Sequence, residues 1–126
     1  PIVYYHQNAS KLASNREANS ALPDEGKNIP IPWNRVQNSY TEKSRILAQM
    51  ISSRLNTLNS IKNIRIQGAP LAVLQGAHMP AILIEAGYLT NPAEEKNLRN
   101  HRFLTDVAAE ISWGIENFLT RSNQNE

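Results

Sequence analysis

The chain has 126 residues, of which 40% are hydrophobic and 19% are charged, and its formal charge is +2. This length and composition suit one globular domain, or part of a larger one, and exclude a disordered tail. The small charge and the scattered basic residues give no argument for nucleic-acid binding. The absence of Cys excludes disulfides and thiolate metal sites, and no apolar run approaches the ~20 residues of a membrane helix.

The first segment of the chain reads as a strand. Residues 2–5 are β-branched or aromatic, a composition typical of a short strand inside a domain. We therefore expect the sequence to be a fragment of a longer protein, with any export signal upstream. Residues 6–38 are rich in Asn, Ser, Asp, Gly and Pro, which predicts a long loop or insertion, with a weak helix possible over 12–22.

The middle of the chain predicts one helix and three short strands. Ser39 and Glu42 have the spacing of a capping box, and a helix is predicted over 40–58. Its apolar stripe recurs every three to four residues: Ile46, Leu47, Met50, Ile51, Leu55 and Leu58. Strands are predicted over 64–67, 71–74 and 81–84, and the last is continuously apolar, as expected of a strand covered on both faces.

Two helices are predicted in the last third. Asn91 can cap the first, Pro92 suits its first position, and Glu94 lies where the helix dipole favours an anion. The second is predicted over 102–120, followed by a polar tail over 121–126. Its predicted buried stripe is Leu104, Val107, Ala108, Ile111, Ile115, Phe118 and Leu119. The order of elements predicts an α/β fold, a sheet with helices packed on it.

Glu85 is the sharpest candidate for chemistry. It follows the apolar run 81–84 directly, and ligands of α/β proteins bind beyond the carboxyl ends of strands. The functional interpretation is a carboxylate in a site. The structural one is a strand-end residue that caps the next turn or pairs with an Arg.

The stretch around Glu85 has a long ordered pattern. From Met79 to Glu95 it runs Pro-Ala, an apolar strand, Glu85, a small residue, Gly, an aromatic residue, Leu, Thr, Asn, Pro and acidic residues. This pattern resembles the C-terminal motif of the zinc-dependent N-acetylmuramoyl-L-alanine amidases. The similarity extends over about residues 33–119, including the helix around Gln37 to Ala48 and the closing helix before residue 119.

The resemblance implies the C-terminal part of one incomplete amidase-type (phosphorylase/hydrolase-like) catalytic domain over residues 1–120. It implies that Glu85 acts as acid/base beside a zinc-bound water that hydrolyses the amide between N-acetylmuramic acid and L-alanine in peptidoglycan. This substrate implies a periplasmic or cell-envelope location. Whether a partner protein activates the enzyme stays open.

The zinc ligands of the family are two His and one Glu, and the resemblance places the first His and the Glu upstream of this chain. The second His follows a strand, and His6 fits it in one register. In the other register, residues 2–5 match the family's next strand, and His6 is no ligand. We expect the fragment alone to be inactive; the alternative is a non-catalytic amidase-like module that binds peptidoglycan or another partner.

Several further residues allow two interpretations. Trp33 and Tyr88 could stack on a sugar or pack in the core, and His78 could face a cleft or lie on the surface. Gln75 stands where many relatives carry Arg, and Arg65 is the nearest candidate to replace it.

Overall fold

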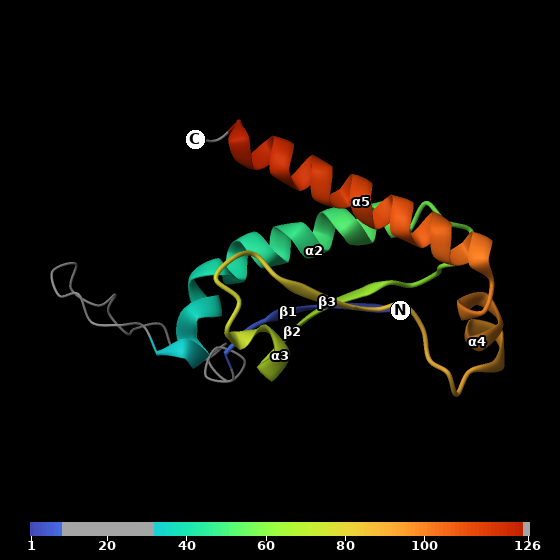
Figure 1. Cartoon of the computed structure of the whole chain (residues 1–126), viewed down its shortest axis with the longest axis horizontal. Coiled ribbons are helices and arrows are strands. Elements are labelled where there is room, and N and C mark those ends of the chain that lie inside the picture. Colours follow the sequence, from blue (N-terminus) through green and yellow to red (C-terminus); the bar gives the residue numbers. More distant parts are fainter. Residues whose placement is uncertain (9–31, 125–126) are drawn as a thin grey trace, which may run out of the picture.

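The computed structural model describes residues 1–8 and 32–124 (Figure 1). The weak helix predicted over 12–22 lies outside these residues. The elements are, in chain order, β1 (Ile2–His6), the 3-10 helix η1 (Trp33–Tyr40), α2 (Thr41–Leu55), β2 (Arg65–Ala69), α3 (Ala72–Gln75), β3 (Ile82–Glu85), α4 (Pro92–Leu98) and α5 (His101–Asn123).

The three strands form one mixed sheet in the order β2-β1-β3. β1 runs parallel to β2, with Ile2 opposite Arg65, and antiparallel to β3, with Ile2 opposite Glu85. The strands predicted near residues 2–5, 64–67 and 81–84 are therefore confirmed within a residue or two. The α/β class is confirmed as well, since helices pack on this sheet.

The core lies between α2, α5 and one face of the sheet. Figure 1 shows α2 between α5 and the strands, and α2 contacts both. The buried cluster is Leu47, Ile51, Leu55, Ile61, Phe103, Val107 and Phe118. Ile82 and Ile84 of β3 pack against this cluster, so the face of β3 that carries them is turned to α2. Glu85, one residue further, belongs to the opposite face because side chains alternate along a strand.

Close approach of α5 to α2 depends on Gly114. A Cβ at this position would lie 2.7 Å from Cγ1 and 3.0 Å from Cα of Ile51. The same interface holds an ion pair of 2.8 Å between Arg54 and Glu110. The Arg54 guanidinium also lies 4.6 Å from the ring centroid of Trp113, which fits a cation–π contact.

Two strand predictions need correction. Residues 71–74 do not form a strand: α3 occupies most of this segment, since four apolar residues carry no periodicity that separates a helical turn from a strand. The apolar run 81–84 was predicted to be covered on both faces. In the described part of the chain β3 is instead an edge strand, and all four of its residues are half-buried.

The helix ends also differ in part from the predictions. The loop predicted over 6–38 is wrong at its end, because residues 33–40 form a 3-10 helix. α2 covers 41–55 and not the predicted 40–58. The predicted capping box is wrong because the Glu42 carboxylate binds Arg45 instead. α5 continues to Asn123, into the predicted tail. None of the helices described here is both long and apolar enough to cross a membrane.

The buried stripe of α5 was predicted only in part. Val107 and Phe118 are buried as expected, and Phe103 joins them. Leu104, Ala108, Ile115 and Leu119 are exposed instead. These exposed apolar residues form a second row next to the buried one. Both rows repeat every three to four residues, so the sequence pattern alone does not separate the buried row from the exposed one.

Candidate functional site

Glu85 ends β3, and its side chain is half-buried. The predicted structural alternative was an ion pair with an Arg or a cap of the next turn. Within the described residues Glu85 forms no ion pair, and its polar contact is a hydrogen bond of 3.4 Å that the hydroxyl of Tyr88 donates to Oε2. The carboxylate is therefore available for chemistry at the end of its strand.

The loop after Glu85 is fixed by the start of α4. The Asn91 side chain accepts hydrogen bonds from the N–H groups of Ala93 (3.0 Å) and Glu94 (3.3 Å), which confirms the predicted cap. Glu94 in turn accepts from the Tyr88 N–H at 2.8 Å and from Nδ2 of Asn91 at 3.2 Å. One carboxylate thus ties the loop to the helix that follows it.

Gly87, two residues after Glu85, allows the loop to lie close to the start of α4. A Cβ on Gly87 would lie 3.1 Å from Oε2 of Glu94 and 3.4 Å from Cδ1 of Leu98. The first of these distances is tighter than an ordinary van der Waals contact. The glycine therefore lets the loop pass close enough for Glu94 to reach the backbone of Tyr88.

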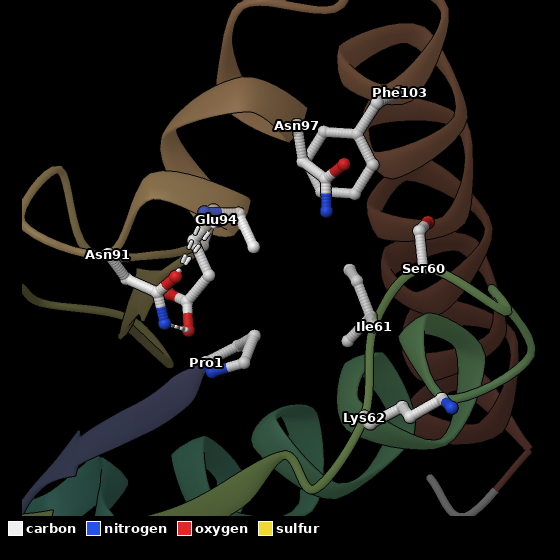
Figure 2. A pocket seen from close by; sticks show the side chains of 10 residues that line it. Pro1, Ser60, Ile61, Lys62, Asn91, Glu94, Asn97 and Phe103 are labelled. Carbon is white, nitrogen blue, oxygen red and sulfur yellow. Dashed lines mark hydrogen bonds between the residues drawn. The ribbon is translucent and has the colours of Figure 1, made fainter.

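A cavity of about 250 Å³ opens beside this loop. Figure 2 shows Asn91 and Glu94 on one side of it, Ile61 on the other, and Asn97 next to the ring of Phe103 at the top of the view. Ala86, the neighbour of Glu85, also lines it, whereas Glu85 does not. The cavity joins amide and carboxylate groups to an apolar wall, a combination suited to a ligand with both polar and apolar parts.

The row of residues across the sheet at Glu85 has mixed charge. Ile2 lies between Arg65 and Glu85 in register, so the three side chains share the face opposite α2. Partial burial raises the pKa of Tyr88, the charge of Glu85 raises it further, and Arg65 opposes this effect. Tyr88 is therefore a neutral hydroxyl, a hydrogen-bond donor, at neutral pH.

The segment that leads into β3 is held by Gln37, which is fully buried. Its Nε2 donates to the carbonyl oxygens of Ala77 (2.8 Å) and Met79 (2.7 Å). Ser44 donates to Oε1 of Gln37 at 2.9 Å and accepts from the N–H of Ala81 at 3.0 Å. η1 and α2 thus fix the start of the strand that carries Glu85.

His6 lies at the other end of the sheet. It ends β1, whereas Glu85 pairs with Ile2 at the start of β1. At ~3.3 Å per residue the two positions are about 13 Å apart along the strand. The described structure therefore does not bring His6 and Glu85 together around one water molecule.

His6 is enclosed by protein and has no access to solvent. Its side chain is fully buried, and Nδ1 lies 3.2 Å from the carbonyl oxygen of Leu71, so the tautomer with a proton on Nδ1 donates there. Nε2 has no hydrogen-bond partner among the described residues. In metal sites, a His often donates one ring N–H to a backbone carbonyl and binds the metal with the other nitrogen, and His6 has this arrangement of its ring. It lacks companions, because residues 1–8 and 32–124 contain no group of three His, Cys, Asp or Glu that could hold a metal.

The zinc expected from the family resemblance therefore has no complete site in this part of the chain. The single unpartnered nitrogen of His6 does not make one, and Glu85 lies too far away to join it.

Of the remaining candidates, His78, Trp33 and Gln75 lie away from Glu85, and Arg65 lies in the same row of the sheet. His78 is exposed, and its ring meets that of Tyr40 edge to face at 5.6 Å. Trp33 is 67% exposed and covers Gly76, where a Cβ would collide with the indole ring. Gln75 is half-buried at the end of α3, whereas Arg65 is exposed in the row that contains Glu85. Of the residues weighed from the sequence, Tyr88 and Arg65 are thus the ones the structure brings towards Glu85.

Comparison with known proteins agrees with this fold and motif. A family model described as N-acetylmuramoyl-L-alanine amidase matches residues 2–117, and the chain belongs to that family. It is 32% identical over 110 residues to the amidase AmiC of Neisseria meningitidis serogroup B, a match that covers 87% of this chain.

Two further relatives carry the same activity in their names. The chain is 27% identical to the N-acetylmuramoyl-L-alanine amidase AmiC of Escherichia coli O6:H1, over 69% of its length. It is 26% identical to AmiA of Salmonella typhimurium, over 67% of its length. It spans 24% of the Neisseria protein and 21% and 29% of these two. No solved structure matches the chain.

Proposed function

We propose that this chain is part of an enzyme that hydrolyses the amide between N-acetylmuramic acid and L-alanine in peptidoglycan. The observation that carries the proposal is Glu85, a half-buried carboxylate without an ion pair among the described residues, at the end of β3 in the family's motif. The named activity of the relatives supports the same substrate. Because this substrate lies in the cell wall, the proposal includes an extracytoplasmic location.

In this proposal Glu85 moves the proton of the reaction. Its carboxylate takes a proton from the attacking water while oxygen bonds to the amide carbon. It then gives that proton to the nitrogen of the leaving L-alanine as the C–N bond breaks. A zinc ion bound by residues outside the described part of the chain would supply a more acidic water.

The test replaces Glu85 by Gln in the product of the full open reading frame that contains this chain. We expect digestion of dye-labelled peptidoglycan to fall by ~10²–10⁴-fold, the usual contribution of general acid–base catalysis. Glu116→Gln, an exposed carboxylate on α5, is the matched control and should leave the rate unchanged. Mass spectrometry of the products should show stem peptides with a free L-alanine amine.

The outcomes separate the enzyme from a binding module. Digestion by Glu85→Gln at the rate of the unmodified protein would exclude the acid/base role. If the unmodified protein binds peptidoglycan in sedimentation assays and digests none, the chain is a non-catalytic module. The expected zinc requirement is measured apart from these variants, by loss of digestion in a chelator and its recovery with added zinc.

A further inference from the structure

The hydroxyl of Tyr88 is the polar group that contacts Glu85 in the described structure. It donates to Oε2, whereas Oε1 has no hydrogen-bond partner among the described residues. The two oxygens of one carboxylate are therefore unequal: one is held and the other is free to meet a water molecule or a substrate.

The position of Tyr88 is set by its backbone. Its N–H donates to Oε2 of Glu94 at 2.8 Å, and its carbonyl oxygen accepts from the N–H of Asn91 at 3.1 Å. Gly87 allows this close passage of the loop. Tyr88 is thus held on both sides before any ligand binds, which is the condition for a preorganised contact.

We propose that Tyr88 is a positioning residue for Glu85: its hydroxyl holds Oε2 and leaves Oε1 to carry the proton. This inference rests on the proposed function and extends it to a residue to which the amidase motif assigns only an aromatic ring. The pKa of Tyr88 is raised, first by partial burial and then by the charge of Glu85, so the hydroxyl keeps its proton and stays a donor in the neutral range.

The consequence for Glu85 is geometric. The contact from the Tyr88 hydroxyl to Oε2 is 3.4 Å long and restrains one of the two carboxylate oxygens. Without the hydroxyl, Oε2 loses this partner, and the carboxylate can turn so that either oxygen meets the water.

The first measurement is the rate of peptidoglycan digestion by the product of the full open reading frame that contains the chain. Tyr88→Phe keeps the ring and removes the hydroxyl. We expect kcat to fall about 3–10-fold with little change in KM, since the hydroxyl acts on the orientation of Glu85 and not on substrate binding. Tyr40→Phe is the control, since Tyr40 packs against His78 away from the site.

The second measurement needs no activity. Carbon-13 relaxation NMR of the Glu85 side chain, assigned with Glu85→Gln, measures how ordered its carboxyl group is in this 126-residue chain with and without the Tyr88 hydroxyl. A less ordered carboxyl group in Tyr88→Phe supports the inference even if the protein digests nothing, a result that would overturn the proposed function alone. Unchanged order and an unchanged kcat in an active enzyme would overturn the inference and leave the proposed function standing.

Discussion

Ser44 donates a hydrogen bond of 2.9 Å to the side-chain amide of Gln37, and both residues are fully buried. Neither group has a charge, and each has further partners in the segment between α3 and β3. A buried polar network whose members are all paired fixes one arrangement, because any shift would leave a donor or acceptor without a partner. This pair therefore positions β3 from a distance, and with it Glu85.

Gln37→Ala should lower the free energy of unfolding by about 2–4 kcal/mol, since it leaves the carbonyl oxygens of Ala77 and Met79 and the Ser44 hydroxyl without their shared partner. Urea unfolding followed by circular dichroism measures the change. Gln49→Ala, on the exposed side of α2, should stay within about 0.5 kcal/mol of the unmodified chain. Equal stability of the two variants would show that the network is not a stabilising feature.

Glu94→Ala should free the loop after Glu85, because its carboxylate holds both the Tyr88 N–H and the Asn91 side chain. We expect hydrogen exchange at the Tyr88 amide to become about tenfold faster, which corresponds to ~1.4 kcal/mol of local protection. Glu95→Ala is the control, since Glu95 binds Arg99 on the surface of α4. The Tyr88 amide should exchange at its original rate in that variant.

Gly114→Ala should destabilise the chain although alanine favours a helix. The added methyl would meet Cγ1 and the backbone Cα of Ile51, and backbone cannot turn away from it. The helix propensity gain of about 1 kcal/mol is opposed by ~1–3 kcal/mol of overpacking, so thermal unfolding should show a net loss. Asn117→Ala, at an exposed position of α5, should show a gain or no change. A more stable Gly114→Ala variant would contradict the close contact of α2 and α5.

Tyr88 should ionise above the ordinary tyrosine pKa of about 10. Its raised pKa means that folding favours the neutral phenol, so its contribution to stability is complete below pH ~10 and is lost as the pH rises through the raised value. The difference in phenolate absorbance between the unmodified chain and Tyr88→Phe isolates this titration. Glu85→Gln should lower the midpoint only partly, because burial is the larger cause. A Tyr88 titration midpoint at the ordinary tyrosine pKa would contradict both the raised pKa and its contribution to stability.

Local patterns predicted the elements whose causes are local. Asn91 caps α4 with its own side chain, and Pro92 follows it, so two adjacent positions define that helix start. The strand predicted over 71–74 was wrong because the pattern is too short: four apolar residues fit a strand or a single helical turn equally well. The exposed Leu104 shows that periodicity gives a helix and its apolar side, but not how much of that side a neighbour covers.

The sequence could name Glu85 as a candidate, but it could not give the arrangement of the residues around it. Glu85 stood out because a carboxylate directly follows an apolar strand. Glu85 and His6 lie at opposite ends of the sheet because β1 and β3 are antiparallel. No short sequence pattern specifies the relative direction of two strands. The role of Gln37 depends on carbonyl groups 40 and 42 residues later in the chain, so it could not be read from the residues around it. The acid/base role of Glu85 and the ligand role of His6 stay predictions.

The central place of β1 has a consequence for biosynthesis. Its two partners, β2 and β3, are translated more than sixty residues after it, so a ribosome releases the middle of the sheet long before either edge exists. Both sides of β1 stay unpaired until β2 has been synthesised, and the side that pairs with β3 stays unpaired until Glu85 has been added. Assembly of the sheet is therefore a late, non-local event, and we expect it to limit the rate of folding.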